Sequence, residues 1–210
     1  QGHGDALGLV ADVSRSADLA KGVQAIQESW GQLDIVVANA GVNGVWAPVE
    51  DLRDEEWDRV FAINVRGTFL TVRQTVPLLK VRGGAIAIVS SVNGTRTLGI
   101  AGASAYASTK AAQLAFGRMM ALELAQHRIR VNTVCPGSIE TRIDENTEHR
   151  NLSAIHQAAI FPGGTVPLTD GKPGTAGQVA ELLWFLCSDL ATHISGAEVF
   201  IDGAESLLKG

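Results

Sequence analysis

Short apolar runs alternate with longer segments of helical periodicity along the chain. The runs are nearly continuous in Val, Ile and Ala, as expected for strands that helices cover on both faces. This alternation predicts an α/β fold in which a parallel sheet forms the middle of three layers. Strands are expected at residues 7–13, 33–38, 85–90, 129–135 and 198–202. Helices are expected at residues 16–30, 54–79, 103–126 and 175–188, with a loop-rich stretch at 138–173.

Composition and charge narrow the possible functions. The 210 residues are 46% hydrophobic and carry a formal net charge of −5, which is typical of one globular domain over residues 1–210. This charge argues against a broad basic surface for nucleic acid or anionic membranes. No apolar stretch approaches the roughly 18 residues of a membrane span, and no signal pattern stands at the start, so we expect a cytoplasmic protein. Cys135 and Cys187 are too isolated for a disulfide framework or a metal site.

The strongest chemical signal is a tyrosine followed four residues later by a lysine. Tyr106 and Lys110 lie in a run of small residues at the start of a predicted helix, so both side chains leave the same face. The ammonium favours the phenolate and should lower the tyrosine pKa from its reference of about 10. Ser91 follows the apolar run at 85–89, at the end of a strand where open parallel sheets bind ligands. Together they suggest proton transfer to or from an oxygen of a small carbonyl or alcohol.

Eight short motifs occur in an order and spacing found in one enzyme family. They are Asp12-Val13, Asn39-Ala40-Gly41, Asn64-Val65-Arg66-Gly67, Ser90-Ser91 with Gly94, Tyr106 to Lys110, Asn132, Pro136-Gly137 with Thr141, and Ile201-Asp202-Gly203. On these motifs the chain resembles a classical short-chain dehydrogenase/reductase over essentially its whole length. The resemblance implies a Rossmann-like, doubly wound sheet. It also implies an oxidoreductase that uses NAD or NADP to interconvert a ketone and a secondary alcohol, and it leaves the choice of cofactor open.

The resemblance also implies roles for the candidate catalytic residues. Tyr106 would be the general acid, or the base in the oxidative direction, and Ser91 would hydrogen-bond the same substrate oxygen. Lys110 would bind the nicotinamide ribose and lower the pKa of Tyr106. Asn64 would hold a water that links Lys110 to solvent. No residue is assigned to a metal.

Cofactor contacts follow from the same resemblance. The first strand end would contact adenine, the second would approach the adenosine ribose, and the loop after the strand at 129–135 would line the nicotinamide. Tyr106 and Lys110 would contribute as well. The residues assigned in this way are Asp12, Val13, Asn39, Ala40, Gly41, Pro136, Gly137, Ile139 and Thr141.

Plainer interpretations of several of these residues remain open. Asn64 is also explained as a side chain that satisfies backbone groups, and Asp12 as a turn former after a strand. Gly41 and Gly137 also fit ordinary turns. Three tryptophans on apolar helix faces are predicted to be core residues, whereas Trp46, in a loop, is a candidate to roof a substrate site. The predicted core tryptophans are Trp30, Trp57 and Trp184.

The chain departs from the family pattern at its start. Nothing before Asp12 resembles the strand, glycine-rich turn, helix and strand that hold the cofactor pyrophosphate. The sequence therefore suggests an N-terminally truncated member, whether by fragmentation, a mis-started gene product or strands swapped between chains. We expect such a chain to bind nicotinamide cofactor weakly. A second hypothesis makes it a non-catalytic scaffold or oligomerisation module that no longer binds cofactor.

Two further expectations concern the substrate and the assembly. Residues 143–172 are predicted to form a flexible loop over the substrate, with Gly163, Gly164 and Gly171 suiting a mobile segment. The two long helices, at 54–79 and 103–126, are predicted to join copies into a homodimer or homotetramer. The expected partner is a small carbonyl or alcohol substrate.

Overall fold

A parallel sheet lies at the centre of the computed structural model, which describes residues 4–96, 100–156 and 164–208. All its strands run in the same direction, so their carboxyl ends meet at one edge. The residues predicted for chemistry at strand ends are therefore gathered there. In spatial order, the strands are β1 (Ile35–Ala38), β3 (Gly84–Val89), β4 (Ile129–Pro136) and β8 (Glu198–Ile201).

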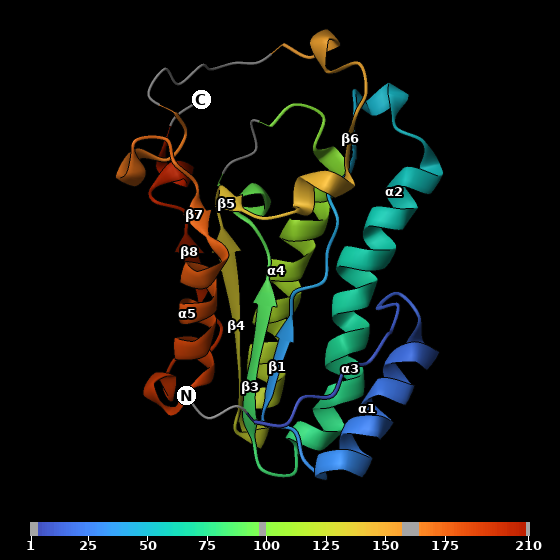
Figure 1. The fold of residues 1–210 in the computed structure, drawn as a ribbon, viewed down its shortest axis with the longest axis vertical. Coiled ribbons are helices and arrows are strands. Elements are labelled where there is room, and N and C mark those ends of the chain that lie inside the picture. The colour runs from blue at the N-terminus through green and yellow to red at the C-terminus, as the bar shows by residue number, and fades with distance from the viewer. Residues whose placement is uncertain (1–3, 97–99, 157–163, 209–210) are drawn as a thin grey trace.

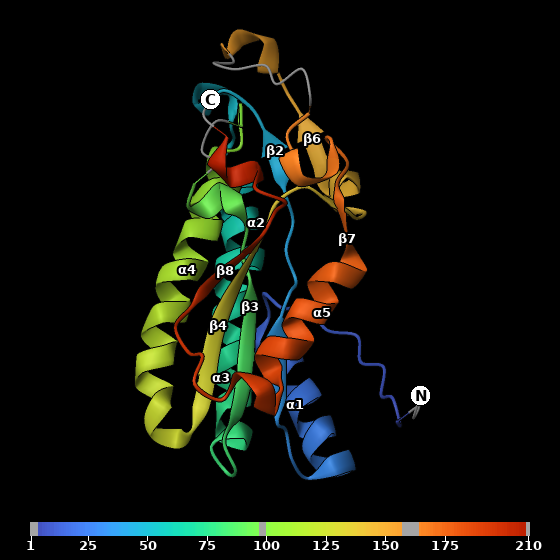
Figure 2. The same ribbon diagram turned by 90° about the vertical axis from the view of Figure 1, so that its left-hand side faces the viewer.

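Helices cover both faces of this sheet. Figure 2 shows α3 and α4 on one face and α5 on the other, and α1 packs along α3. The predicted three-layer α/β fold is thus confirmed. The helices are α1 (Ser16–Trp30), α2 (Asp54–Phe61), α3 (Gly67–Leu79), α4 (Ser104–Leu124) and α5 (Ala176–Cys187). The helix expected at 54–79 is α2 and α3 joined by the π-helical turn Ala62–Arg66, a departure from α geometry that often marks functional positions.

Local signals in the sequence account for several helix ends. Gly31, at φ 67°, ends α1, and its N–H donates to Gln27 O over 2.9 Å. Thr175 and Gln178 form a capping box that starts α5, each side chain accepting from the backbone N–H of the other. These caps fix where the helices begin and end relative to the strands.

The core lies between the sheet and the two helices α3 and α4 that cover one of its faces. Leu79 of α3, Ile86 and Ile88 of β3, and Leu124 of α4 pack in one cluster and are at most 1% exposed. Burying such side chains stabilises a fold by about 1.5–3 kcal/mol each. This packing anchors β3, which leads into Ser91, and α4, which carries Tyr106 and Lys110.

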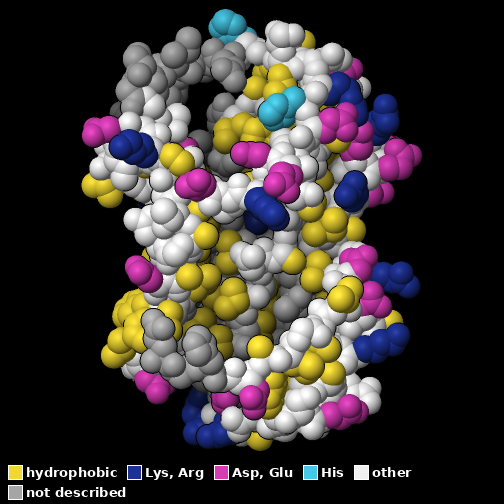
Figure 3. Space-filling model, viewed as in Figure 1, with side chains coloured by type: hydrophobic (Ala, Val, Ile, Leu, Met, Phe, Trp, Pro, Cys, Tyr) yellow, Lys and Arg dark blue, Asp and Glu magenta, His cyan; other side chains and the backbone are white. Residues whose placement is uncertain are grey.

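The strand predicted at residues 7–13 does not form. The chain there is irregular and exposed, and Val10 is fully accessible to solvent. A strand requires a neighbour for its backbone hydrogen bonds, and no described strand lies next to this run. Apolar composition alone therefore gave a wrong prediction. Figure 3, a space-filling model in the orientation of Figure 1, shows hydrophobic side chains in a hollow on this face of the molecule. Ile35 and Val37 of the edge strand β1 are 48% and 42% exposed.

Two short parallel pairs were not predicted. Strand β2 (Gly44–Trp46) pairs with β6 (Thr147–His149), and β5 (Ile139–Glu140) pairs with β7 (Gly174–Thr175). The predicted substrate loop at 143–172 therefore includes a strand and short helical turns in its described part, and residues 157–163 lie outside the described residues. Its flexibility stays a prediction. Figure 2 shows β2 and β6 at the end of the molecule toward which the main strands run.

The prediction that three helix tryptophans belong to the core is wrong. Trp30, Trp57 and Trp184 are 48%, 36% and 66% exposed. Trp57 instead stacks on Phe61 at the surface of α2, with ring centroids 4.7 Å apart. Amphipathic spacing identified a helix face in each case, but it did not determine whether another element covers that face. In the described part of the chain, no helix is both long and apolar enough to span a membrane.

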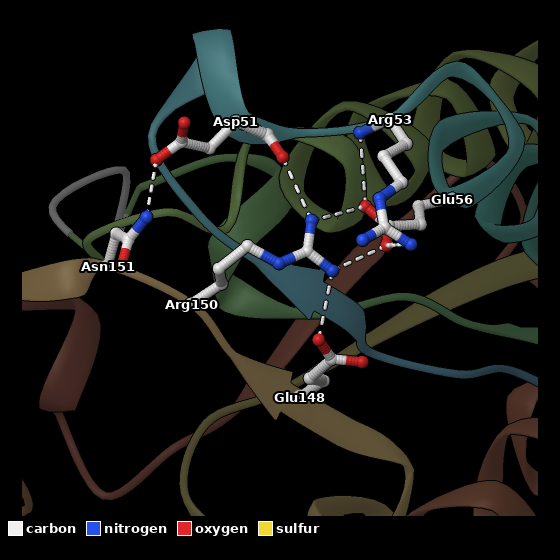
Figure 4. Close-up of polar contacts among 6 residues, drawn as sticks. All are labelled: Asp51, Arg53, Glu56, Glu148, Arg150 and Asn151. Carbon is white, nitrogen blue, oxygen red and sulfur yellow. Dashed lines mark hydrogen bonds and ion pairs between the residues drawn. The ribbon is translucent and has the colours of Figure 1, made fainter.

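An arginine joins the β2–β6 pair to the start of α2 (Figure 4). The Arg150 guanidinium donates to both carboxylate oxygens of Glu56, at 3.0 and 2.6 Å, to Glu148 at 2.9 Å and to the carbonyl of Asp51 at 2.9 Å. Asn151 adds a hydrogen bond to the Asp51 carboxylate. The hydrogen bonds from Arg150 hold the pKa of Glu56 down at about 2. We call Arg150 and Glu56 the clamp.

Candidate active site

Ser91 and Tyr106 meet where β3 ends. Ser91 caps the short 3₁₀ turn Val92–Gly94 by accepting from the N–H of Asn93 at 3.2 Å. Tyr106, on the first turn of α4, is hydrogen-bonded to Ser91. Both side chains are buried, at 7% exposed each. The strand end and the helix start therefore bring two hydroxyls to one point, as the sequence predicted.

Lys110 lies on the same face of α4, one turn beyond Tyr106. Its Nζ is 5.5 Å from the centroid of the Tyr106 ring and donates to the carbonyl of Val89, at the end of β3, over 3.0 Å. Ser90 ties the same two elements together, because its hydroxyl donates to the Lys110 carbonyl at 2.8 Å. The lysine is 4% exposed. The predicted serine, tyrosine and lysine thus form one buried group.

The pKa of Tyr106 moves opposite to the prediction. Burial raises it above its ordinary value of 10, and the hydrogen bond to Ser91 only partly opposes this. The Lys110 ammonium donates to a backbone carbonyl and lies 5.5 Å from the centre of the ring. Burial also lowers the pKa of Lys110 to about 8. In the free protein Tyr106 is therefore a protonated acid at neutral pH, and sequence spacing could not reveal the desolvation that causes this.

Asn64 lies at the centre of the π-helical turn and is fully buried. Its Oδ1 accepts from the N–H of Val42 at 2.9 Å, and its Nδ2 donates to the Val42 carbonyl and to Thr109 Oγ1, both at 3.0 Å. The plainer interpretation of Asn64, as a side chain that satisfies backbone groups, is therefore observed. Its predicted role in holding a water stays a prediction. These bonds fix the loop after β1 against α4, beside Lys110.

Gly41 marks a place where backbone comes close to Lys110. A Cβ at this position would lie 3.3 Å from Asn64 Oδ1 and 3.6 Å from Lys110 Nζ. Lys110 has three donors, and its one hydrogen bond within the described residues goes to Val89. A buried ammonium with donors to spare beside an open glycine suits the hydroxyls of a ribose. The residues present thus fit the nicotinamide end of a dinucleotide.

Predicted cofactor residues from two parts of the chain meet at a second site, a small cavity. Val13, Asn39 and Ala40 line one cavity of about 170 Å³ between α1, the end of β1 and α3. Asp12 lies next to it but is exposed, and its carboxylate accepts from the N–H and the hydroxyl of Ser14, at 2.9 and 2.7 Å. These bonds lower its pKa. Asp12 therefore forms a turn, and its predicted place at a strand end is wrong.

The predicted nicotinamide loop follows β4. Pro136 pairs with Ile201 of β8, and a Cβ on Gly137 would come within 2.4 Å of the Glu205 carboxylate. Further along the chain, Ile139 lies in β5 and Thr141 is exposed. Thr141 accepts from the N–H of Ile143 at 3.3 Å, a local contact. The structure thus places Pro136 and Gly137 at the carboxyl edge of the sheet, Ile139 in the short strand β5, and Thr141 exposed in the turn that follows.

Comparison with known proteins identifies the family. The family described as Enoyl-(Acyl carrier protein) reductase matches residues 1–204. The cyclopentanol dehydrogenase of Comamonas sp. is 36% identical over 196 residues, which cover 93% of this chain and 74% of that enzyme. The chain belongs to the short-chain dehydrogenase/reductase family. This family of oxidoreductases is the one that the eight motifs indicated.

Two solved structures of the family share the fold. A 3-ketoacyl-ACP reductase from Sinorhizobium meliloti is 53% identical with a TM-score of 0.94, covering 98% of this chain and 81% of that one. A 3-ketoacyl-(acyl-carrier-protein) reductase from Brucella melitensis, complexed with NADH, is 29% identical with a TM-score of 0.82, covering 95% and 78%. The Rossmann-like architecture is therefore shown, and one relative at this similarity binds a nicotinamide cofactor.

Several supporting residues of this short-chain dehydrogenase/reductase were not predicted. Thr109 accepts from Asn64 and donates to the Tyr106 carbonyl at 2.7 Å. Gln113 donates to the Asn64 carbonyl at 2.9 Å and to Thr68. Both lie on the buried face of α4 at one-turn spacing from the catalytic candidates, and this spacing could have identified them. Among the described residues, no group of three His, Cys, Asp or Glu side chains could hold a metal.

Gly94 allows the turn after Ser91 to lie directly on α4. A Cβ there would lie 2.6 Å from the Lys110 carbonyl carbon and 2.7 Å from the N atom of Ala111, and neither backbone atom can move freely. We expect Gly94→Ala to lower the free energy of unfolding by about 1–3 kcal/mol, measured by urea denaturation. Gly177→Ala in α5 is the matched control, because its Cβ would meet only Thr175 Oγ1 at 3.7 Å. It should be neutral or stabilising by up to about 1 kcal/mol. Equal stability of Gly94→Ala and the wild type would contradict the tight contact.

Proposed function

We propose that the protein is an NAD(P)-dependent oxidoreductase that interconverts a ketone and a secondary alcohol. The observation that carries the proposal is the buried group formed by Ser91, Tyr106 and Lys110 at the end of β3. A phenol that can donate a proton, a serine hydroxyl hydrogen-bonded to it and a buried ammonium together suit a substrate oxygen that gains or loses negative charge. The scaffold hypothesis gives no reason for such a costly buried arrangement, and we do not favour it.

Each side chain has a distinct task in the proposed reaction. In reduction, the carbonyl carbon gains a hydride while the Tyr106 hydroxyl gives its proton to the carbonyl oxygen. The C=O π bond and the Tyr106 O–H bond break, one C–H and one O–H bond form on the product, and Tyr106 is left as the phenolate; the hydride would come from a bound reduced nicotinamide. Ser91 donates a hydrogen bond to the same oxygen and orients it. The Tyr106 phenol is protonated at neutral pH in the free protein, as a proton donor in the reduction must be.

The nicotinamide cofactor, when bound, would supply or accept the hydride. Lys110 would hold its ribose, and the backbone at Gly41 would lie alongside. The adenosine part would lie in the cavity between α1, the end of β1 and α3, which is lined by Val13, Asn39 and Ala40. The family relatives support this proposal, since one was solved with NADH. The choice between NAD and NADP is part of the test.

The substrate proposal follows from the same relatives and is tested by turnover. The cyclopentanol dehydrogenase relative suggests a small cyclic ketone or alcohol. We expect the purified 210-residue chain to consume NADH or NADPH with cyclopentanone, followed by the loss of reduced-nicotinamide absorbance. The cofactor is supplied at millimolar concentration so that weak binding does not hide turnover. No consumption of either cofactor with any of a panel of cyclic and linear ketones would refute the proposal.

A homodimer through α3 and α4 is the proposed assembly. The two helices carry exposed large apolar side chains that a second copy could cover, with Phe69 of α3 and Met119 and Leu122 of α4 at 42%, 60% and 77% exposed. We expect Leu122→Glu to shift the molecule from dimer to monomer in sedimentation velocity. Leu168→Glu, at a 79% exposed leucine away from these helices, is the control and should leave the dimer intact. A monomeric wild type would contradict this assembly.

A further inference from the structure

Trp46 lies beside the turn that leads into the catalytic helix. The N–H of the next residue, Ala47, donates to the Gly102 carbonyl at 3.2 Å. Gly102 has φ 76°, and a Cβ there would lie 2.5 Å from Leu152 and 2.9 Å from the Trp46 carbonyl carbon. Gly102 stands one helical turn before Tyr106. The loop after β1, the start of α4 and the segment after β6 are therefore packed together at this point.

The Trp46 indole packs against a neighbouring ring, but its N–H lacks a hydrogen-bond partner within the described residues. Its ring lies 5.5 Å from the ring of His149, centroid to centroid, across the β2–β6 pair. Its Nε1 is buried and has no hydrogen-bond partner within the described residues. A buried N–H without a partner is unfavourable, and such groups in proteins usually meet an acceptor. An acceptor on a bound ligand would remove this penalty.

The clamp lies directly after the β2–β6 pair that carries this indole, and the two are joined through the backbone. The Arg150 N–H donates to the Trp46 carbonyl at 2.9 Å, which continues the β2–β6 pairing by one residue. Its guanidinium is held by Glu56, which in turn accepts from the N–H of Arg53 at 3.0 Å at the start of α2. The Arg150 and Glu56 side chains are only 21% and 17% exposed. A bidentate pair of this kind restricts orientation more than a lysine could.

We propose that Trp46 is a specificity-determining residue whose indole N–H binds a second acceptor of the substrate, and that Arg150 is the residue that positions it. This rests on the proposed function, because it assigns the substrate class of the same site. The substrate class is a ketone that carries a second oxygen on the side away from the reacting carbonyl, such as a diketone or a hydroxyketone. The aromatic pair of Trp46 and His149 would pack against its apolar body.

The test compares two ketones that differ by one acceptor. Cyclohexane-1,4-dione and cyclohexanone are titrated into ¹⁵N-labelled protein, and the indole N–H signals of the four tryptophans are followed by NMR. Trp46→Phe removes one signal and so assigns it. We expect the dione to move the Trp46 signal and cyclohexanone to move it less. Saturation transfer to the ligand protons measures the binding of each ketone without turnover.

Variants separate the indole from its support. Trp46→Phe keeps an aromatic ring without the N–H donor, and we expect it to lose the preference for the dione by about fivefold while still binding cyclohexanone. Arg150→Met should broaden or shift the Trp46 signal and reduce the same preference. Arg142→Met is the matched control, because Arg142 forms an exposed ion pair with Glu145 on the same segment without contacting β2. It should preserve both the signal and the preference.

The outcomes distinguish this proposal from the proposed function. A Trp46 signal that stays unmoved by the dione, or a Trp46→Phe variant that keeps the preference, overturns the role of the indole. Turnover of ketones with an unmoved signal refutes this inference alone. A signal that moves in a protein without turnover shows that the indole binds the second acceptor, refutes the reductase and, with it, overturns the role of Trp46 in substrate specificity. An Arg150→Met variant with an unchanged Trp46 signal and preference overturns the positioning role.

Discussion

Replacing Tyr106 by phenylalanine is expected to lower kcat by about 10²–10⁴, the usual contribution of a positioned general acid. The substitution removes one hydroxyl and keeps the ring, which is buried on the first turn of α4. The substitution leaves the substrate site and Lys110, the proposed contact of the cofactor ribose, in place. We therefore expect KM to change far less than kcat. Steady-state kinetics with cyclopentanone measures both constants. Turnover unchanged by this substitution would end the proposed mechanism.

The same residue offers a direct check of its ionisation. Tyr106 is the only tyrosine of the chain, so the phenolate absorbance reports its pKa alone. Because burial raises this pKa, the absorbance should rise only at a pH above 10. Tyr106→Phe serves as the control and should show no such signal. A phenolate that appears below pH 10 in the free protein would instead support lowering by Lys110, as its spacing in the sequence suggested.

That contrast shows what the sequence could and could not predict. The meeting of Tyr106 and Lys110 depends on helical spacing, and the meeting of both with Ser91 depends on a strand followed by a helix. Both are local or topological properties, so a pattern reveals them. The sign of a pKa shift depends on how many atoms surround the group, and residues distant in sequence supply those atoms. The burial of Tyr106, which is 7% exposed, could not be read from the motif.

Errors elsewhere have the same origin. Residues 7–13 have the composition of a strand, but a strand also needs a partner, which no local pattern specifies. The clamp joins Arg150 to Glu56 across 94 positions, so neither residue has a local signal that announces the other. The sequence predicts a loop position for Trp46 and makes it a candidate to roof a substrate site, whereas the structure places it at the end of β2. Its unpartnered N–H and its contact with the turn at Gly102 emerge only from the folded chain.

Replacing Lys110 by methionine is expected to lower kcat. The same substitution should abolish one pH dependence of the free energy of unfolding. Loss of a buried donor and positive charge should lower kcat by about 10²–10³. Burial lowers the pKa of Lys110 from 10.5 to about 8. This shift corresponds to about 3 kcal/mol of stability lost while the group is charged in the folded state. Methionine fills a similar volume without this penalty.

The sign of the pH dependence follows from proton counting. Between pH 8 and 10.5 the folded protein has released the Lys110 proton while the unfolded chain still holds it. The unfolded state binds more protons in this range, so wild-type stability should rise with pH. The stability of wild type relative to Lys110→Met should therefore increase by about 3 kcal/mol across the range, measured by urea denaturation at each pH. Lys80→Met, at an exposed lysine, should follow the wild type. Parallel curves for wild type and Lys110→Met would show that Lys110 is not desolvated, and the buried ammonium on which the active-site proposal depends would have to be abandoned.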